Sequence, residues 1–417
     1  MNLGFSAVNI NPQQEVELSG YGFYLNRRTK KVMDDIYARA ILLQDDDKEF
    51  LILNCDLLSL SNYVSNEIKR RVSETLKLPM EQILLLCIHT HTAPTVTHLI
   101  GCGEITWEYI ELLINKLVSV AIDAKNKVYL VKNVRGGVNE IDPIGYNRAD
   151  PNGPLDNNVY AISFELEGRR PYVMVNYACH PVTLGRLCEV SPDFPGEVVK
   201  ELNNQGYDGM FLNGFCGDVD PVSNQEEWGG GTKKTIEEFG RRIVKGALYA
   251  IDFGTKQTST LSSTSFSFDI TLERYGWKEV DDVFQTMFAT IQEGKPEKAA
   301  ATEWAKLVKR DIMSLSKPYS ENIEIQVVKI GDYILVGAPG ELFTQIALDI
   351  RNDLGGIFLM LCSNANGALH YVATDQDIRN KTYGGFSSNI PYGTLPIQLG
   401  TAQLFAEKTA EGIRSIL

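Results

Sequence analysis

The chain has few of the features that would place a protein in a membrane or outside the cell. No stretch of its 417 residues approaches the roughly 18 consecutive apolar residues of a membrane-spanning helix. The opening segment, MNLGFSAVNINPQ, has neither the basic region nor the apolar region of a secretory signal peptide. We therefore expect a cytoplasmic protein with no integral membrane association.

Paired cysteines are also missing. The seven cysteines are an odd number and include no CxxC pair, which argues against a disulfide scaffold. Several lie in apolar runs, so we expect reduced residues of the core. Cys179 and Cys216 flank polar motifs and stay open as nucleophiles, although a buried cysteine more commonly acts as a small apolar residue.

Positive charge is in deficit. The 53 Asp and Glu residues outnumber the 40 Lys and Arg residues and give a formal net charge of -13. A negative surface argues against nucleic acid and anionic membranes as main partners, although solubility alone would explain the charge. The apolar fraction of 44% and the charged fraction of 22% are those of an ordinary globular protein.

Histidine is scarce, and two of the five histidines stand in one motif, ILLLCIHTHTAPT at residues 83–95. The apolar run is short and bounded, so it predicts a buried strand that ends in a Thr-Ala-Pro loop. On an extended strand, His89 and His91 would point to the same side and could bind a metal ion or act as a base. A pair of hydrogen-bonded surface histidines is the alternative. The other histidines are His98, His180 and His370.

Two later segments repeat this arrangement. The apolar run PYVMVNYAC at 171–179 ends at His180, and the run at 209–212 leads into the polar loop NGFCGDVDP at 213–221. Ligands of α/β proteins bind at the carboxyl ends of the strands. We therefore expect the three loops to contribute to one site.

Apolar periodicity predicts the remaining elements. The expected strands cover residues 37–43, 50–55, 171–179, 209–212 and 355–362, and a hairpin is expected at 323–336. The expected helices cover residues 62–76, 235–251 and about 400–416, and a further helix is expected to begin after Thr106 as its N-cap. Residues 276–318 indicate a helical excursion, which is either a lid or an ordinary packed helical pair. With no linker or repeat visible, the sequence indicates one α/β domain over residues 1–417, with mixed β-sheets flanked by helices.

Five segments together resemble the neutral/alkaline, non-lysosomal ceramidase family of zinc amidases. They are CIHTHTAPT, NYACHPVTLG, NGFCGDVDP, GAPGELF and GALHYVAT followed by TYGG, and the opening GFSAVNINP and the GYG at 20–22 also fit. The resemblance covers essentially the whole chain. It implies a single compact catalytic domain like the N-terminal domain of that family, with Zn²⁺ as the cofactor.

The resemblance also implies the metal ligands. His89, His180, Glu341 and Tyr371 match the positions of the family's zinc ligands. Two imidazoles and a carboxylate with an open position form a common catalytic zinc set, whereas a tyrosine ligand is uncommon. For Glu341 the alternative is a carboxylate at the N-terminus of a helix.

Four further residues match active-site positions of the family. His91 matches a residue that faces the substrate, Arg148 matches an arginine of an NR motif, and Tyr383 matches a second tyrosine. Together they could stabilise a developing oxyanion; a surface arginine and a core tyrosine are the alternatives. Asp220 stands where the family has a serine that is thought to be the nucleophile. It could act as a general base on a water at the zinc, or hold a neighbouring group.

The expected function is a zinc-dependent hydrolase, and the favoured activity is an amidase that cleaves an N-acyl (C–N, non-peptide) bond of a small-molecule acyl substrate. Asp220 and the lack of a visible C-terminal sandwich domain argue against ceramide itself as the substrate. A zinc esterase or lactonase and a non-catalytic metal-containing binding protein are the alternatives. Structural zinc sites are usually closed and rich in cysteine, so histidine and oxygen ligands favour catalysis.

Overall fold

Two β-sheets form the centre of the fold in the computed structural model, which describes residues 1–288, 291–292, 294–314 and 319–417. Within these residues the larger sheet has nine strands in the order β11-β10-β9-β7-β1-β4-β5-β6, with β13 beside β7. They are β1 (Asn2–Asn9), β4 (Tyr37–Asp45), β5 (Lys48–Cys55), β6 (Ile83–Cys87), β7 (Val128–Glu140), β9 (Asn158–Leu166), β10 (Tyr172–Tyr177), β11 (Asp208–Asn213) and β13 (Thr255–Gln257). The smaller sheet contains β14 (Leu261–Thr271), β15 (Ser320–Ile330), β16 (Tyr333–Gly337) and β18 (Leu359–Cys362).

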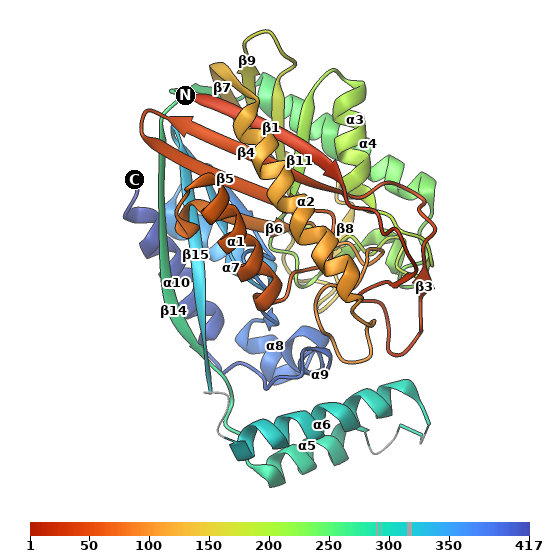
Figure 1. The fold of residues 1–417 in the computed structure, drawn as a ribbon. Helices are drawn as coiled ribbons and strands as arrows, with labels where there is room; N and C mark the ends of the chain where they lie inside the picture. Colours follow the sequence, from red (N-terminus) through yellow and green to blue (C-terminus); the bar gives the residue numbers. More distant parts are fainter. Residues whose placement is uncertain (289–290, 293, 315–318) are drawn as a thin grey trace.

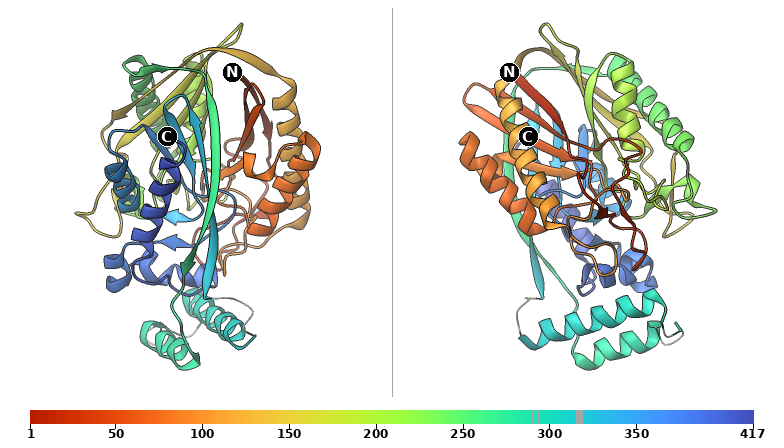
Figure 2. Two further views of the ribbon diagram at one scale, coloured as in Figure 1. Left: turned by 90° about the vertical axis from the view of Figure 1, so that its left-hand side faces the viewer. Right: turned by 45° about the vertical axis from the view of Figure 1, so that its right-hand side comes forward.

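The two sheets pack face to face, and helices cover their outer faces (Figure 2). Side chains alternate along a strand, so each strand of the smaller sheet serves two cores. On β16, Leu335 belongs to the core between the two sheets, whereas Ile334 and Val336 belong to the core between the smaller sheet and its helices. The larger sheet is covered by α1 (Asn62–Leu76), α2 (Trp107–Asn126), α3 (Phe194–Asn204) and α4 (Lys233–Asp252), and the smaller by α7 (Thr344–Leu354) and α10 (Thr401–Arg414).

The curl of the larger sheet brings its two edge strands together. Strands β6 and β11 stand at opposite ends of the strand order, yet side-chain amides link the segments around them. Asn54 donates a hydrogen bond to the carbonyl of Phe211 at 2.7 Å, and Asn213 donates one to the carbonyl of Ile88 at 3.0 Å. The loops that follow β6, β10 and β11 therefore meet in one place.

The predicted elements are largely confirmed, including the hairpin of β15 and β16, whose turn contains Gly331 at a φ of +60°. Thr106 occupies the N-cap of α2 as predicted, although its side chain makes no capping hydrogen bond. One boundary was wrong. The strand expected from residue 355 begins only at Leu359, because Gly355 and Gly356 adopt positive φ angles at the end of α7.

A pair of helices lies between β14 and β15 in the sequence. They are α5 (Trp277–Phe288) and α6 (Pro296–Ser314), and they lie beyond α8 (Asp375–Asn380) and α9 (Asn389–Tyr392) in Figure 1. Trp304 on α6 is buried and donates a hydrogen bond to the carbonyl of Thr394 at 2.8 Å. Residues 289–290, 293 and 315–318 of the expected excursion lie outside the described residues.

Two further observations bear on the expected class of protein. Among the helices that the structure describes, none combines the length and apolar character needed to span a membrane. All seven cysteines are free, and six of them are buried whereas Cys188 is exposed. Free, buried cysteines agree with the prediction that most of them are core residues.

Candidate metal centre and active site

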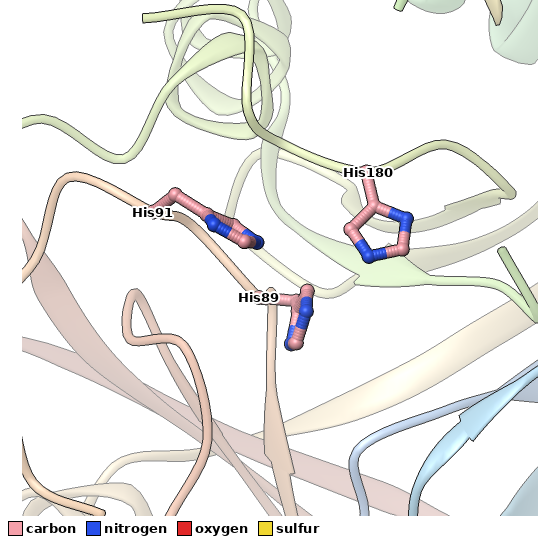
Figure 3. Close-up of side chains that lie close together, drawn as sticks. All are labelled: His89, His91 and His180. Carbon is pink, nitrogen blue, oxygen red and sulfur yellow. The ribbon is translucent and has the colours of Figure 1, made fainter. Parts of the chain in front are cut away.

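Three histidines from two loops converge at the end of the larger sheet (Figure 3). His89 and His91 follow β6, and His180 follows β10. Their side chains are almost fully buried, with exposed fractions of 1%, 7% and 0%. One ring nitrogen of each lies within 4.8 Å of the corresponding nitrogens of the other two. The alternative of a solvent-exposed histidine pair is therefore wrong.

The reason for this proximity differs from the one expected. Strand β6 ends at Cys87, so His89 and His91 do not continue an extended strand. His89 instead adopts a φ of +73°, a conformation that non-glycine residues rarely occupy. A hydrogen bond from its backbone N–H to the carbonyl of Leu57 at 2.9 Å helps to hold it there. The sharp turn, rather than the alternation of a strand, directs the two imidazoles to one place.

The hydrogen bonds of the three imidazoles define their tautomers. Each Nδ1 lies close to a backbone carbonyl, and because a carbonyl can only accept, Nδ1 carries the proton and Nε2 keeps its lone pair. These Nδ1 contacts are His89 to Leu58 at 2.9 Å, His91 to Gly20 at 2.8 Å and His180 to Cys216 at 2.7 Å. The Nε2 atoms of His89 and His91 are buried without a hydrogen-bond partner. Buried acceptors without partners are what a metal ion would satisfy.

Glu341 completes this donor set from β17 (Glu341–Leu342). Its Oε2 atom lies 2.9 Å from Nε2 of His180 and 3.2 Å from Nε2 of His89. Glu341 is 4% exposed, and burial opposes its ionisation, so an ionised carboxylate at this place needs a positive charge beside it. Helix α7 begins only at Thr344, so Glu341 is not the helix N-terminal carboxylate of the alternative interpretation.

The contact between His180 and Glu341 supports a cation at this place. Nδ1 of His180 already donates its proton to a carbonyl, so Nε2 would face the carboxylate with a lone pair unless a second proton or a metal ion lay between them. Burial, together with Arg148, lowers the pKa of His180 and disfavours the doubly protonated imidazolium. Imidazole and carboxylate donors are those that zinc commonly takes, and the set therefore fits a divalent ion.

Tyr371 and Arg148 lie beside the histidines and Glu341. The strand β19 (Tyr371–Val372) pairs in parallel with β17, so that Tyr371 and Glu341 are register partners. The tyrosine ring stacks on His180 with the ring centroids 6.5 Å apart. Its hydroxyl accepts a hydrogen bond from Nη2 of Arg148 at 2.8 Å, and burial raises its pKa well above the usual value.

Arg148 and Asp220 form an ion pair at the edge of the cluster. The strands β8 (Gly145–Asn147) and β12 (Val219–Pro221) pair with each other and bring the two residues together. Nη1 of Arg148 donates to Oδ1 of Asp220 at 3.1 Å, and Nη2 donates to the carbonyl of Gly217 at 2.8 Å. The side chain of Arg148 is 16% exposed, so it is not a free surface arginine.

Tyr383 lies at the outer side of this group. Its ring lies 5.6 Å from that of Tyr371 and 5.5 Å from the guanidinium carbon of Arg148, with 48% of the residue exposed. It is therefore not a core tyrosine. All eight residues that the sequence singled out lie in one connected group; their chemical roles stay predictions.

Two aromatic residues that the sequence did not single out contact this group. Tyr392 of α9 donates a hydrogen bond to Oε1 of Glu341 at 2.5 Å. Trp228 donates its indole N–H to Oδ2 of Asp220 at 3.0 Å and stacks on Tyr21, with the ring centroids 4.3 Å apart. Both lie in loop-rich sequence without periodicity, so no local signal distinguished them.

The two cysteines that stayed open as nucleophiles are Cys179 and Cys216. Both are buried next to the site, with exposed fractions of 0% and 2%. Burial raises the pKa of both thiols well above the usual value. The thiolate is the nucleophilic form of cysteine, so these environments disfavour nucleophilic catalysis by either residue.

Comparison with known proteins identifies the fold. No protein-family model and no curated protein sequence matches the chain. Neutral ceramidase from Pseudomonas aeruginosa is 17% identical and superimposes with a TM-score of 0.75, covering 100% of this chain and 75% of that chain. A ceramidase complexed with C2 is 16% identical, with a TM-score of 0.76 and the same coverage. The chain has a neutral-ceramidase-like fold, as its motifs predicted.

Proposed function

We propose that this protein is a zinc-dependent hydrolase, and specifically an amidase that cleaves the C–N bond of an N-acyl, non-peptide small molecule. One observation carries the proposal: the imidazoles of His89, His91 and His180 converge in the buried interior beside the carboxylate of Glu341, and two of their Nε2 atoms have no hydrogen-bond partner. The ceramidase fold supports amide hydrolysis as the reaction class, since the proteins with similar structures are named for it.

In this proposal His89, His180, Glu341 and Tyr371 hold the Zn²⁺ ion. When bound there, zinc supplies a Lewis acid that polarises an acyl carbonyl and lowers the pKa of water. The chain itself orients the ligands, because each histidine Nδ1 is fixed by a backbone carbonyl. Burial of the imidazoles keeps bulk water away from the metal site.

The remaining residues act on the acyl group. Arg148 and Tyr383 lie beside the metal ligands and would donate hydrogen bonds to the developing oxyanion. His91 lines the same space, and its unprotonated Nε2 would accept a hydrogen bond from the substrate or from water. Asp220 is the candidate general base. Its two oxygens already accept hydrogen bonds from Arg148 and Trp228, so acting as a base requires one of them to be exchanged for water.

The same groups would serve an esterase or a lactonase, because both reactions pass through an oxyanion at an acyl carbon. The cytoplasm as the compartment and a small acyl compound as the substrate are part of the proposal. A panel of acyl amides, esters and lactones of equal chain length separates these activities. A protein that binds zinc but hydrolyses none of them would be a binding protein rather than an enzyme.

Metal analysis tests the site directly. We expect the purified protein to contain about one zinc per chain, as catalytic sites of this type do. His180→Ala removes a ligand and should abolish the bound zinc, whereas His98→Ala, which changes an exposed histidine, should leave it unchanged. Elemental analysis of the three proteins, with circular dichroism to confirm folding, decides the assignment. Equal zinc in His180→Ala and wild type would refute it.

A further inference from the structure

The cavity beside the histidine cluster has an aromatic wall and one basic side chain. Its volume is about 530 Å³, within the range of roughly 300–1,000 Å³ that holds small-molecule ligands. The rings of Phe23, Trp228, Phe343, Tyr371 and Tyr383 line it. Among the described residues that line this cavity, Arg148 is the only one with a lysine or arginine side chain. It is therefore the group that could attract an anionic ligand.

Asp220 neutralises that arginine from within the fold. It is buried, with 2% of the residue exposed, and its Oδ1 atom accepts a hydrogen bond from Nη1 of Arg148. The Nη2 atom of Arg148 donates hydrogen bonds to the carbonyl of Gly217 and to the hydroxyl of Tyr371. Three of the five N–H donors of the guanidinium are thus occupied by the chain, and its charge is balanced by Asp220.

Trp228 fixes the carboxylate of Asp220 in this position. Its indole N–H donates a hydrogen bond to Oδ2 of Asp220. The indole ring stacks on Tyr21, and the hydroxyl of Tyr21 donates a hydrogen bond to the backbone carbonyl of Trp228 at 2.6 Å. Rotation of the carboxylate away from Arg148 would break the indole hydrogen bond. The pairing therefore belongs to the organised site rather than to a mobile surface contact.

The other carboxylates near the cavity do not compete for Arg148. Asp218 is turned toward the start of α7, where it accepts hydrogen bonds from the N–H and hydroxyl of Thr344 and from Asn147. Glu341 faces the histidines and Tyr392. Asp220 is thus the residue that holds the guanidinium charge in balance.

We propose that Asp220 is a specificity-determining residue which, by pairing with Arg148, makes this cavity select uncharged acyl compounds over carboxylates. The inference rests on the proposed acyl-hydrolase function. Hydrolysis of an amide forms a carboxylate and an amine, and an unpaired arginine beside the acyl site would retain the carboxylate product. Pairing with Asp220 removes this attraction while it leaves the remaining N–H groups of Arg148 free to contact a neutral carbonyl.

Ligand affinity tests the proposal without requiring turnover. Hexanoate and 1-hexanol serve as matched anionic and neutral probes, and dissociation constants are measured by ligand-observed NMR on the purified, metal-containing proteins. Asp220→Asn and Asp220→Ser remove the negative charge that balances the guanidinium, and we expect each variant to bind hexanoate about 10-fold more tightly, as a charge-assisted hydrogen bond allows. The affinity of the variants for 1-hexanol should stay within about twofold of the wild-type value. This ligand is uncharged, and the substitutions leave the apolar side chains that contact its alkyl chain unchanged.

Two controls separate the charge pair from other effects. Trp228→Phe removes the hydrogen bond to Oδ2 but keeps both partners of the pair, so hexanoate affinity should change far less than in the Asp220 variants. Arg148→Gln added to Asp220→Asn should abolish the gain. Arg148→Gln alone leaves Asp220 unpaired and should increase the affinity for hexylammonium about 10-fold, which provides a second route if the Asp220 variants fail to fold.

The outcomes are distinguishable. Folded Asp220 variants with unchanged hexanoate affinity overturn the proposal, and a lowered kcat in those variants would then assign Asp220 to general-base catalysis alone. A gain that persists after Arg148→Gln also overturns it. If no acyl compound is hydrolysed by the wild type yet the affinities shift as expected, the proposed function fails and the role of Asp220 in ligand selection stands.

Discussion

At the scale of single residues, the histidine cluster depends on backbone geometry as much as on side-chain identity. His89 adopts a φ of +73°, and such conformations of non-glycine residues cost of order 1–3 kcal/mol. The cost is offset by the surrounding structure, in which the N–H of His89 reaches Leu57 and its Nδ1 reaches Leu58. A strained residue that presents an imidazole to a buried polar cluster is consistent with a binding or catalytic role.

Tyr392 should determine how tightly the metal is held. Its hydroxyl donates to Oε1 of Glu341 and leaves Oε2 facing His89 and His180. Residues that orient metal ligands typically contribute 10- to 100-fold to metal affinity, so we expect Tyr392→Phe to weaken zinc binding by about that factor. Competition with a chelator measures the affinity.

A second buried tyrosine provides the control. Tyr109 donates its hydroxyl to the carbonyl of Ile10 at 2.7 Å and belongs to the core beneath α2 rather than to the metal centre. Tyr109→Phe should therefore cost stability without a change in zinc affinity. If the two substitutions affected the chelator competition equally, Tyr392 would have no specific role at the metal site.

Residue types at the site could be predicted from the sequence, but several contacts could not. His89, His180 and Glu341 stand in short motifs at the ends of apolar runs, and the fold brings them together. Trp228 and Tyr392 reach the site from irregular segments, where neither periodicity nor a motif indicates a direction. Their positions follow from the tertiary packing of distant loops.

At the scale of elements, α6 is anchored to the domain next to the metal centre. Trp304 is 2% exposed and bonds the carbonyl of Thr394, two residues after Tyr392. Truncation of a buried tryptophan typically costs 3–5 kcal/mol, so Trp304→Ala should lower the free energy of unfolding by about that amount. Urea unfolding followed by circular dichroism measures the change.

Trp277 on α5 is the matched control, because it is 49% exposed. Its ring contacts the ammonium of Lys309, an interaction worth roughly 0.5–1 kcal/mol at an exposed site, so Trp277→Ala should cost no more than that. Equal destabilisation by the two substitutions would show that Trp304 is not a buried anchor. A loss below about 1 kcal/mol in Trp304→Ala would lead to the same conclusion, since burial alone exceeds it.

The sequence predicted long elements better than short ones. Helix α1 and strands β4 and β5 are long enough to show apolar periodicity, and the structure contains these three elements at the predicted positions. Strands β17 and β19 have two residues each, and periodicity cannot be recognised over such a length. They form because distant segments meet, and they set the register that places Tyr371 beside Glu341.

At the scale of the whole molecule, the four layers explain how a site can form from segments far apart in the sequence. The larger sheet curls until the regions around β6 and β11 are linked by Asn54 and Asn213, and the segment that follows β16 supplies Glu341. Hydrophobic patterning predicted an α/β domain with mixed sheets. It could not predict the curl, because that depends on side-chain contacts between segments at opposite ends of one sheet.

The shape of the molecule also bears on the size of the substrate. The cavity of about 530 Å³ is of the size that holds drug-sized ligands, whereas a two-chain lipid is larger. Asp220 moreover stands where ceramidases are expected to have a serine. We therefore expect poor turnover of long-chain ceramide, with kcat/KM at least about 10-fold below that for the best short-chain acyl amide, a difference of about 1.4 kcal/mol in transition-state stabilisation.

Both substrates are assayed in the same detergent, with a short-chain ceramide analogue as the control for micelle effects. Ceramide turnover comparable to that of the best small amide would contradict the prediction and would mean that most of the lipid stays outside the cavity during the reaction.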